Sequence, residues 1–283
     1  MGSWPEPRMV DTGELHIATY SYGSPSSPPL LLLHGFLSTG LVWHDVATAL
    51  ANDWHVIAID QRGRAFSDRA PDGDYSTAAY VKDARAVLAK LHIEKLALAG
   101  HSMGGANVIA FASEFPEMVT SLVVVDMAPE INSGALTQVA AGIAALDGDF
   151  ADIWEARAWQ RKTLPLLSKD AVERRLHSRM VERAGRVVWR EDPAIQKFRQ
   201  ANPMPTAEER WRLLRGVTCR TLFLLGGASG LVSDETAQKS ADTVPVGEWI
   251  RVPNAGHNVF EDNPDDSIAA ISNFLSGDSA WCA

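Results

Sequence analysis

Residues 95–110, KLALAGHSMGGANVIA, decide the fold that this sequence predicts. Within them, Gly100-His101-Ser102-Met103-Gly104 matches the pattern G-x-S-x-G. A chain of this length contains that pattern by chance roughly one time in ten, so its setting matters: an apolar run typical of a strand precedes it, and small and apolar residues typical of a helix follow it. Glycines at both ends permit a sharp strand-to-helix turn that lifts a hydroxyl out of the sheet. Ser102 is therefore the candidate nucleophile.

On both sides of this stretch, short apolar runs alternate with helical patterns, as in βαβ units with a mostly parallel sheet. Strands are predicted at residues 30–34, 55–60, 96–101, 122–126, 221–225 and 248–252. Helices are predicted at residues 41–51, 77–91, 105–115, 233–241 and 264–275. A weakly patterned pair of strands is expected within residues 10–21. The chain is therefore expected to be an α/β protein.

The alternation stops after Asp126. From about residue 129 to residue 214 the pattern is helical, with four tryptophans, many charged residues and no convincing strand. We therefore expect a core domain made of residues 1–128 and 215–283, with residues 129–214 inserted into it as a helical cap. In an open parallel sheet, ligands bind at the carboxyl ends of the strands, which places the expected crevice under the cap.

Composition and charge narrow the class of partner. The chain has 283 residues, 46% of them hydrophobic, and is long enough for one large domain with an inserted subdomain. Its formal net charge of −9 argues against nucleic-acid binding, which needs a clustered basic surface. A small-molecule substrate is therefore the expected partner, and the sequence does not indicate an oligomeric state.

The same survey addresses compartment and cofactors. The first eleven residues carry no secretory signal pattern, and the apolar runs are far shorter than the ~20 residues that span a bilayer. Cys219 and Cys282 are too few for a disulfide framework, so we expect free thiols, no membrane association and a cytoplasmic protein. No cluster has the spacing of metal ligands and no glycine-rich phosphate loop occurs, so no metal and no cofactor are expected.

His257 is the candidate general base. It lies in a loop after the predicted strand at residues 248–252 and before the last predicted helix. An imidazole titrates near neutral pH, so it can accept the proton of a hydroxyl and return it to a leaving group. Two other histidines, His34 and His101, flank motifs and are interpreted as structural.

Two backbone amides are candidates for the oxyanion hole, which stabilises the negative charge that develops during acyl transfer. The amide of Met103 lies at the expected start of a helix, where amides point outward without a partner. The amide of Phe36 follows His34-Gly35, a pair that lets the chain turn back over the serine. The alternative is that His34-Gly35 only makes a tight turn.

Four motifs together resemble the α/β-hydrolase superfamily along nearly the whole chain: His34-Gly35-Phe36, residues 60–68 (DQRGRAFSD), residues 100–105 (GHSMGG) and Gly256-His257. The resemblance implies the α/β-hydrolase fold, a mostly parallel sheet flanked by helices with an inserted helical cap. The second motif departs from the family pattern because Ala65 replaces a glycine. This departure is mild, and we expect structural roles for Asp60 and Arg62.

The resemblance also locates the acid of a catalytic triad. In most members an Asp follows the penultimate strand, but here Ser229 stands at that position, and a serine cannot stabilise an imidazolium by charge. Asp126 ends the strand after the serine's helix and keeps the order serine, acid, histidine. We therefore predict the triad Ser102, Asp126, His257, with Glu130 and Asp234 as alternative acids.

An acid at Asp126 resembles a smaller branch of the superfamily, which includes 2-(acetamidomethylene)succinate hydrolase and bacterial esterases of catabolic pathways. A serine at the turn excludes the epoxide hydrolases and haloalkane dehalogenases, whose nucleophile there is Asp. The leading hypothesis is hydrolysis of a carboxylic ester or lactone of a small, largely apolar substrate through an acyl-enzyme. The alternatives are hydrolysis of an activated amide or C–C bond in a catabolic intermediate, and a ligand receptor without turnover.

Three residues of the expected cap are candidates for substrate binding: Trp154, Trp159 and Arg190. The two tryptophans are five residues apart, about 140° around a helix, so one helix cannot aim both at the pocket. Phe150 and Trp154 are spaced i, i+4 and are expected to share a face that packs the cap on the core. Arg186 and Arg190 have the same spacing, which suits either a bidentate clamp on a carboxylate or a solvated face.

Overall fold

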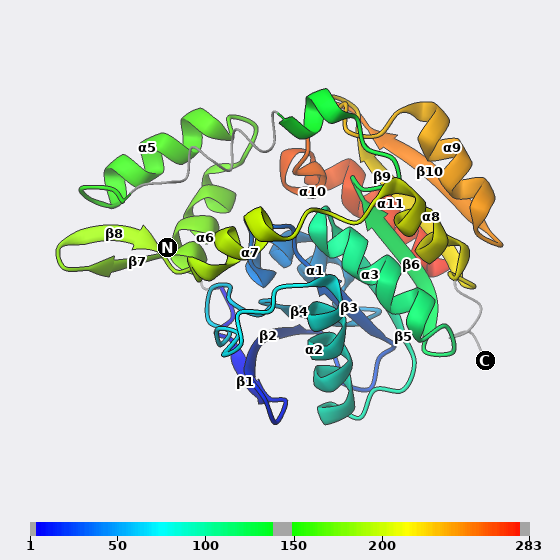
Figure 1. Ribbon diagram of the computed structural model, residues 1–283, viewed down its shortest axis with the longest axis horizontal. Coiled ribbons are helices and arrows are strands. Elements are labelled where there is room, and N and C mark those ends of the chain that lie inside the picture. Colours follow the sequence, from blue (N-terminus) through cyan, green and yellow to red (C-terminus); the bar gives the residue numbers. More distant parts are fainter. Residues whose placement is uncertain (1–3, 138–148, 278–283) are drawn as a thin grey trace.

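The computed structural model describes residues 4–137 and 149–277. Within them, an eight-stranded sheet has the order β1-β2-β4-β3-β5-β6-β9-β10 (Figure 1). β2 pairs antiparallel with β1 and β4, and all other neighbours are parallel, so the mostly parallel sheet is confirmed. The strands are β1 (Arg8–Asp11), β2 (His16–Tyr22), β3 (Pro29–Leu33), β4 (His55–Ile59), β5 (Leu96–His101), β6 (Val119–Val125), β9 (Arg220–Gly226) and β10 (Gly247–Val252).

The inner strands have two buried faces. In β3, Leu31 and Leu33 belong to one hydrophobic cluster, and Leu30 and Leu32 belong to the cluster on the other side. Successive side chains of a strand point to opposite faces, so a strand covered on both sides must be apolar throughout. This explains the uninterrupted apolar runs that marked these strands in the sequence.

Helices cover both faces of the sheet (Figure 1). They are η1 (Gly40–Trp43), α1 (His44–Leu50), α2 (Thr77–Lys90), α3 (Met103–Glu114), α8 (Ala207–Arg215), α9 (Asp234–Thr243), α10 (Val259–Asp262) and α11 (Pro264–Ser276). Side chains of α2, α3, α8 and α9 join the cluster of Leu31, and side chains of α1, α10 and α11 join the cluster of Leu30. The helix expected at residues 41–51 is a 3-10 turn followed by α1.

Between β6 and α8, the described residues form α5 (Ile153–Thr163), α6 (Lys169–Arg179), β7 (Met180–Arg183), β8 (Arg186–Trp189) and α7 (Ala194–Ala201). The expectation of no strand here is wrong, because β7 and β8 form an antiparallel hairpin. Its turn residues Ala184 and Gly185 have φ of 50° and 75°, the positive values that a two-residue hairpin turn requires. At the other end of the segment, α8 packs on the core through Trp211 and Leu214 rather than extending over it.

Helix α6 is anchored on the core by buried arginines. Arg174 donates to both carboxylate oxygens of Asp45 in α1, at 2.9 and 2.6 Å. Arg175 donates to Glu261 of α10, with Nε 3.0 Å from Oε1, and to the amide oxygen of Asn258 at 3.0 Å. The side chains of Arg175 and Glu261 are only 4% and 2% exposed. Removing one member of such a pair leaves an uncompensated buried charge, so these contacts fix α6 in place.

We therefore expect Arg175→Met to lower the free energy of unfolding by about 3–5 kcal/mol, because it leaves Glu261 charged and buried without its cation. The matched control is Arg215→Met, which breaks an exposed pair with Glu208 and should cost about 0–1 kcal/mol. Urea unfolding of the two variants at neutral pH measures both values. Equal, small losses would contradict the anchoring of α6 by this pair.

Candidate active site

Ser102 occupies the turn between β5 and α3. Its φ is +53°, a left-handed value that costs a non-glycine residue about 1–3 kcal/mol. The flanking glycines allow the close approach that this turn needs. A Cβ on Gly100 would lie 2.2 Å from the carbonyl oxygen of Gly104, and a Cβ on Gly104 would lie 2.3 Å from that of Leu33. Side chains at these two positions would thus collide with the backbone, which explains the glycines, and Ser102 stands at the carboxyl end of the sheet.

Asp126 follows β6, the strand next to β5, and its carboxylate is held from three directions. Its Oδ2 lies 2.7 Å from Nδ1 of His257. The hydroxyl of Ser229 donates to the same oxygen, and the amide of Gly226 donates to Oδ1 at 3.1 Å. The position where most family members carry the acid is thus filled by Ser229, and this serine contacts the carboxylate of Asp126 instead.

The two alternative acids lie away from the imidazole. Glu130 accepts hydrogen bonds from the indole of Trp211 at 2.7 Å and from Lys239 at 2.9 Å. Asp234 pairs with Arg251 at 2.6 Å. Of the three acids that the sequence left open, the structure brings Asp126 to His257.

His257 lies in the loop between β10 and α10. Its Nε2 is 3.0 Å from Oγ of Ser102, while its Nδ1 faces the carboxylate and donates to it. Two hydrogen bonds to the backbone hold this loop. Nε2 of His101 donates to the carbonyl of His257 at 2.7 Å, and Asp262 accepts from the amide of Gly256 at 2.9 Å. With Nδ1 protonated, Nε2 is free to accept the proton of the serine hydroxyl.

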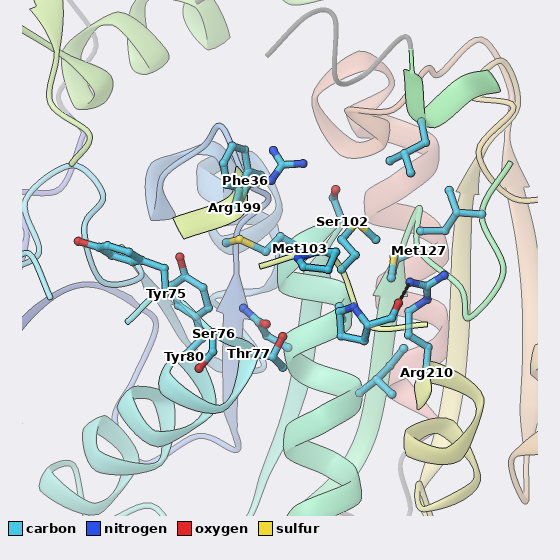
Figure 2. A pocket seen from close by; sticks show the side chains of 18 of the residues that line it. Phe36, Tyr75, Ser76, Thr77, Tyr80, Ser102, Met103, Met127, Arg199 and Arg210 are labelled. Atoms are coloured by element: carbon cyan, nitrogen blue, oxygen red, sulfur yellow. Dashed lines mark hydrogen bonds between the residues drawn. The ribbon is translucent and has the colours of Figure 1, made fainter. Parts of the chain in front are cut away.

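The two residues whose amides are the predicted oxyanion donors line the cavity together with the serine. Met103 is the first residue of α3, so its amide has no partner within the helix and points outward at the positive end of the helix dipole. Phe36 follows Gly35, where a Cβ would lie 3.4 Å from Cβ of Ser102. Phe36, Met103 and Ser102 line one cavity (Figure 2).

That cavity has a volume of about 450 Å³, which suits a small organic ligand. Figure 2 shows Phe36, Tyr75 and Tyr80 on one side of Ser102, and Met127 and Arg210 on the other. Apolar residues form most of the lining, among them Ile109, Met127, Ile131, Leu136, Ile195, Phe198, Leu213 and Leu231.

The tryptophans predicted to bind substrate are not among the described residues that line this cavity. Trp154 is 72% exposed, and Trp159 packs against Phe150 and Trp189, with ring centroids 5.8 and 5.7 Å away. The expected shared face of Phe150 and Trp154 is also wrong, because α5 begins only at Ile153 and the helical spacing does not extend back to Phe150.

The predicted arginines are used elsewhere too. The Nε of Arg190 donates to the carbonyl of Met180 at 2.9 Å, and its guanidinium lies 4.7 Å from the ring centroid of Phe66, outside the cavity lining. Arg186 pairs with Asp149 at 2.7 Å on an exposed surface. Arg186 is the first residue of strand β8, and Arg190 directly follows the strand. In a strand, an i, i+4 spacing does not bring side chains together as it does on a helix.

Helix α7, which the sequence did not single out, reaches the cavity. Ile195, Phe198, Arg199 and Asn202 lie on or next to α7 at spacings i, i+3, i+4 and i+7, and all four line the cavity. That periodicity is the signal of one helix face and was present in the sequence. Arg199 shares this face with Ile195 and Phe198, which was the clue to a cation at an apolar cavity.

Comparison with known proteins accords with this architecture. Residues 28–264 match the family model described as alpha/beta hydrolase fold. The chain belongs to the α/β-hydrolase family. It is therefore a hydrolase, and the fold expected from the four sequence motifs is confirmed.

Curated relatives align over most of this α/β hydrolase. The 2-(acetamidomethylene)succinate hydrolase of Mesorhizobium japonicum is 29% identical over 272 residues, covering 95% of this chain and 94% of the relative. The sn-1-specific diacylglycerol lipase ABHD11 of Mus musculus is 30% identical over 263 residues, covering 90% and 83%. The crystal structure of E-2-(acetamidomethylene)succinate hydrolase superposes with a TM-score of 0.87 at 28% identity, covering 96% of this chain and 99% of the other.

Two further findings concern the part of this α/β hydrolase that the structure describes. No group of three or more His, Cys, Asp or Glu residues in it is placed to hold a metal ion. None of its helices is both long and apolar enough to cross a membrane.

Two buried histidines beside the site are held neutral. Nε2 of His34 accepts the amide proton of Gln61 at 3.0 Å, so Nδ1 carries the proton and donates to the carbonyl of Gly35 at 2.7 Å. Burial lowers the pKa of His34 to about 3. Burial, and next the charge of neighbouring His257, lowers the pKa of His101 well below its ordinary value. Both side chains therefore keep the hydrogen bonds of a neutral imidazole.

These histidines should make the protein sensitive to acid. An unfolded histidine gains a proton near pH 6.5 whereas His101 in the folded protein does not, so stability falls as the pH drops below about 6.5, by about 1.4 kcal/mol per pH unit for each such histidine. His101→Gln should reduce that slope by one histidine's share between pH 6.5 and 5. Urea unfolding at several pH values measures the slope. Identical slopes for the wild type and the variant would contradict the neutral, buried state of His101.

Proposed function

We propose that this α/β hydrolase is a serine hydrolase that cleaves a carboxylic ester or lactone of a small, largely apolar substrate through an acyl-enzyme on Ser102. One observation carries the proposal: Ser102, His257 and Asp126 form a hydrogen-bonded chain at 3.0 and 2.7 Å, open to an apolar cavity of about 450 Å³. The expected partner is accordingly a small molecule.

In the first half of the proposed reaction, Oγ of Ser102 attacks the carbonyl carbon while Nε2 of His257 accepts the hydroxyl proton. Asp126 accepts the hydrogen bond from Nδ1, which holds the ring in the required tautomer and stabilises its charged form. The amides of Phe36 and Met103 donate to the carbonyl oxygen as it becomes negative. The C–O bond to the leaving group then breaks, and the imidazolium returns its proton to the departing oxygen.

In the second half, water takes the place of the leaving group. Nε2 of His257 accepts a proton from the water as its oxygen attacks the acyl carbon, and the same two amides stabilise the second oxyanion. The bond to Oγ of Ser102 breaks, and the serine regains its proton from the imidazolium. The acid product leaves, and the residues return to their starting state.

Hydrolysis of an activated amide is the second candidate. It is favoured by the name of the relative from Mesorhizobium japonicum, a hydrolase of 2-(acetamidomethylene)succinate, which aligns over 95% of this chain. The same triad serves both reactions, since they differ in the group that leaves. The sn-1-specific diacylglycerol lipase of mouse, at 30% identity, supports the ester reading instead. Rates on matched 4-nitrophenyl esters and 4-nitroanilides separate the two.

For the ester reaction we expect Ser102→Ala to lower kcat/KM by about 10³-fold or more, because the variant lacks the attacking oxygen but keeps the turn. Asp126→Asn should lower it by up to about 10⁴-fold, because an amide can neither fix the tautomer of His257 nor stabilise its charged form. Release of 4-nitrophenol from short-chain esters measures both. Wild-type rates in Ser102→Ala would refute the proposal, and an absence of turnover in the wild type would favour a ligand receptor.

Ser229→Ala is the matched control at the same carboxylate. From the sequence alone this change should cost little, since the serine marks a vacated acid position. Its hydrogen bond to Asp126 revises the expectation to a loss of about tenfold, the value of one hydrogen bond to a charged group. The amide of Gly226 still holds the carboxylate in that variant. A loss as large as that of Asp126→Asn would mean that the aspartate cannot work without the hydrogen bond from Ser229, and would contradict the subordinate role given to this serine.

A further inference from the structure

Arg199 is a cation in the apolar cavity. It lies on the face of α7 that lines the cavity, together with Ile195 and Phe198. Its guanidinium carbon is 4.1 Å from the ring centroid of Phe36. In Figure 2 this guanidinium lies beside the Phe36 ring and above the turn that carries Ser102.

Arg199 differs from five well-buried arginines and from Arg210 in having no hydrogen-bond or ion-pair partner among the described residues. It makes no hydrogen bond or ion pair with any residue in the described ranges 4–137 and 149–277. Five well-buried arginines each contact a carboxylate: Arg62 with Asp83, Arg64 with Glu191, Arg174 with Asp45, Arg175 with Glu261 and Arg179 with Glu191. The second arginine of the cavity lining, Arg210, donates to the carbonyls of Pro129 and Pro205. Of these seven arginines, Arg199 alone donates no hydrogen bond to a described residue.

Positive charge is in excess around Phe36. Arg64 also lies over this ring, with its guanidinium carbon 4.4 Å from the centroid, and its Nε and Nη2 are buried without a hydrogen-bond partner. The carboxylate of Glu191 is shared between Arg64 and Arg179. Burial, and next the charge of Arg64, lowers the pKa of Arg199. A partly desolvated cation near a second cation is costly until an anion joins it.

The cavity itself supplies no such anion. Among the described lining residues the carboxylate is that of Asp126, which already accepts hydrogen bonds from His257, Ser229 and Gly226. Asp192, next to Glu191 in the chain, accepts from the hydroxyl of Tyr75 at 2.5 Å. Among the described lining residues, no carboxylate is thus left free to pair with Arg199.

We propose that Arg199 binds a carboxylate of the substrate, so that the hydrolysed ester or lactone carries a carboxylate a few bonds from its scissile carbonyl. This rests on the proposed function, since it concerns the same cavity. The guanidinium lies over the ring of Phe36, and the backbone amide of the same residue is the proposed oxyanion donor. We therefore expect a short acyl chain to connect the bound carboxylate with the scissile carbonyl. A guanidinium suits this role because its planar fork matches a carboxylate with two parallel hydrogen bonds.

Two esters that differ only in charge test the proposal: mono-4-nitrophenyl glutarate and its methyl ester. The wild type should prefer the free acid in kcat/KM by at least about tenfold, and Arg199→Gln should lower the rate on the acid by about 10- to 100-fold while changing the rate on the methyl ester less than about threefold. Arg199→Lys should retain part of the preference, because it keeps the charge but loses the fork. The control is Lys197→Gln, which removes an exposed charge from the same helix and should change neither rate.

A binding measurement keeps this test independent of turnover. Glutarate, compared with sodium chloride at equal ionic strength, should raise the Tm of Ser102→Ala and not that of the double variant with Arg199→Gln. Failure of the proposed function would show as no ester turnover while this Arg199-dependent stabilisation persists. The carboxylate proposal is overturned if Arg199→Gln lowers both ester rates equally or neither of them. It is also overturned if glutarate raises the Tm of both variants alike, or if inorganic phosphate raises the Tm of Ser102→Ala as much as glutarate does.

Discussion

The hydrogen bond between Asp126 and His257 is the contact on which the site depends, and strand register makes it possible. The amide of Ser102 donates to the carbonyl of Val125, and the amide of Asp126 donates to that of Leu224, both at 2.9 Å. The two residues therefore leave neighbouring parallel strands at the same level of the sheet. The carboxylate that follows β6 reaches the imidazole, and Ser229, which follows β9, donates a hydrogen bond to that carboxylate.

The segment between β6 and α8 is tied to the same centre by a buried ion pair. Arg175 of α6 contacts Asn258 and Glu261, so the helix bears on the residue that directly follows His257. Buried pairs of this kind are weak evidence for net stability, but they impose one arrangement because any other leaves a charge unpaired. The position of α6 is thereby coupled to the loop that carries His257. Helix α7 follows in the same segment and places Arg199 in the cavity lining.

Local signals made the core predictable and left the cap largely unpredictable. The apolar runs and the glycines around Ser102 specify their structure within a few adjacent residues. The acid was located by its order along the chain and because Ser229 fills the position where an acid was expected. In the segment between β6 and α8, Phe150 precedes the helix to which its spacing assigned it. Arg190 directly follows a strand of a hairpin whose turn, Ala184-Gly185, lacks the usual asparagine. Side-chain destinations there depend on packing between distant segments, as for Trp159 on Trp189.

The central claim is that Ser102 becomes an activated nucleophile through His257 and Asp126, and a fluorophosphonate probe tests it most directly. Such a probe forms a covalent bond with a serine oxygen only when that oxygen is activated by its base. Intact-mass and peptide mass spectrometry should show one adduct, on Ser102, that is absent in Ser102→Ala and forms far more slowly in Asp126→Asn. An adduct on another residue, or labelling of Asp126→Asn at the wild-type rate, would contradict the account.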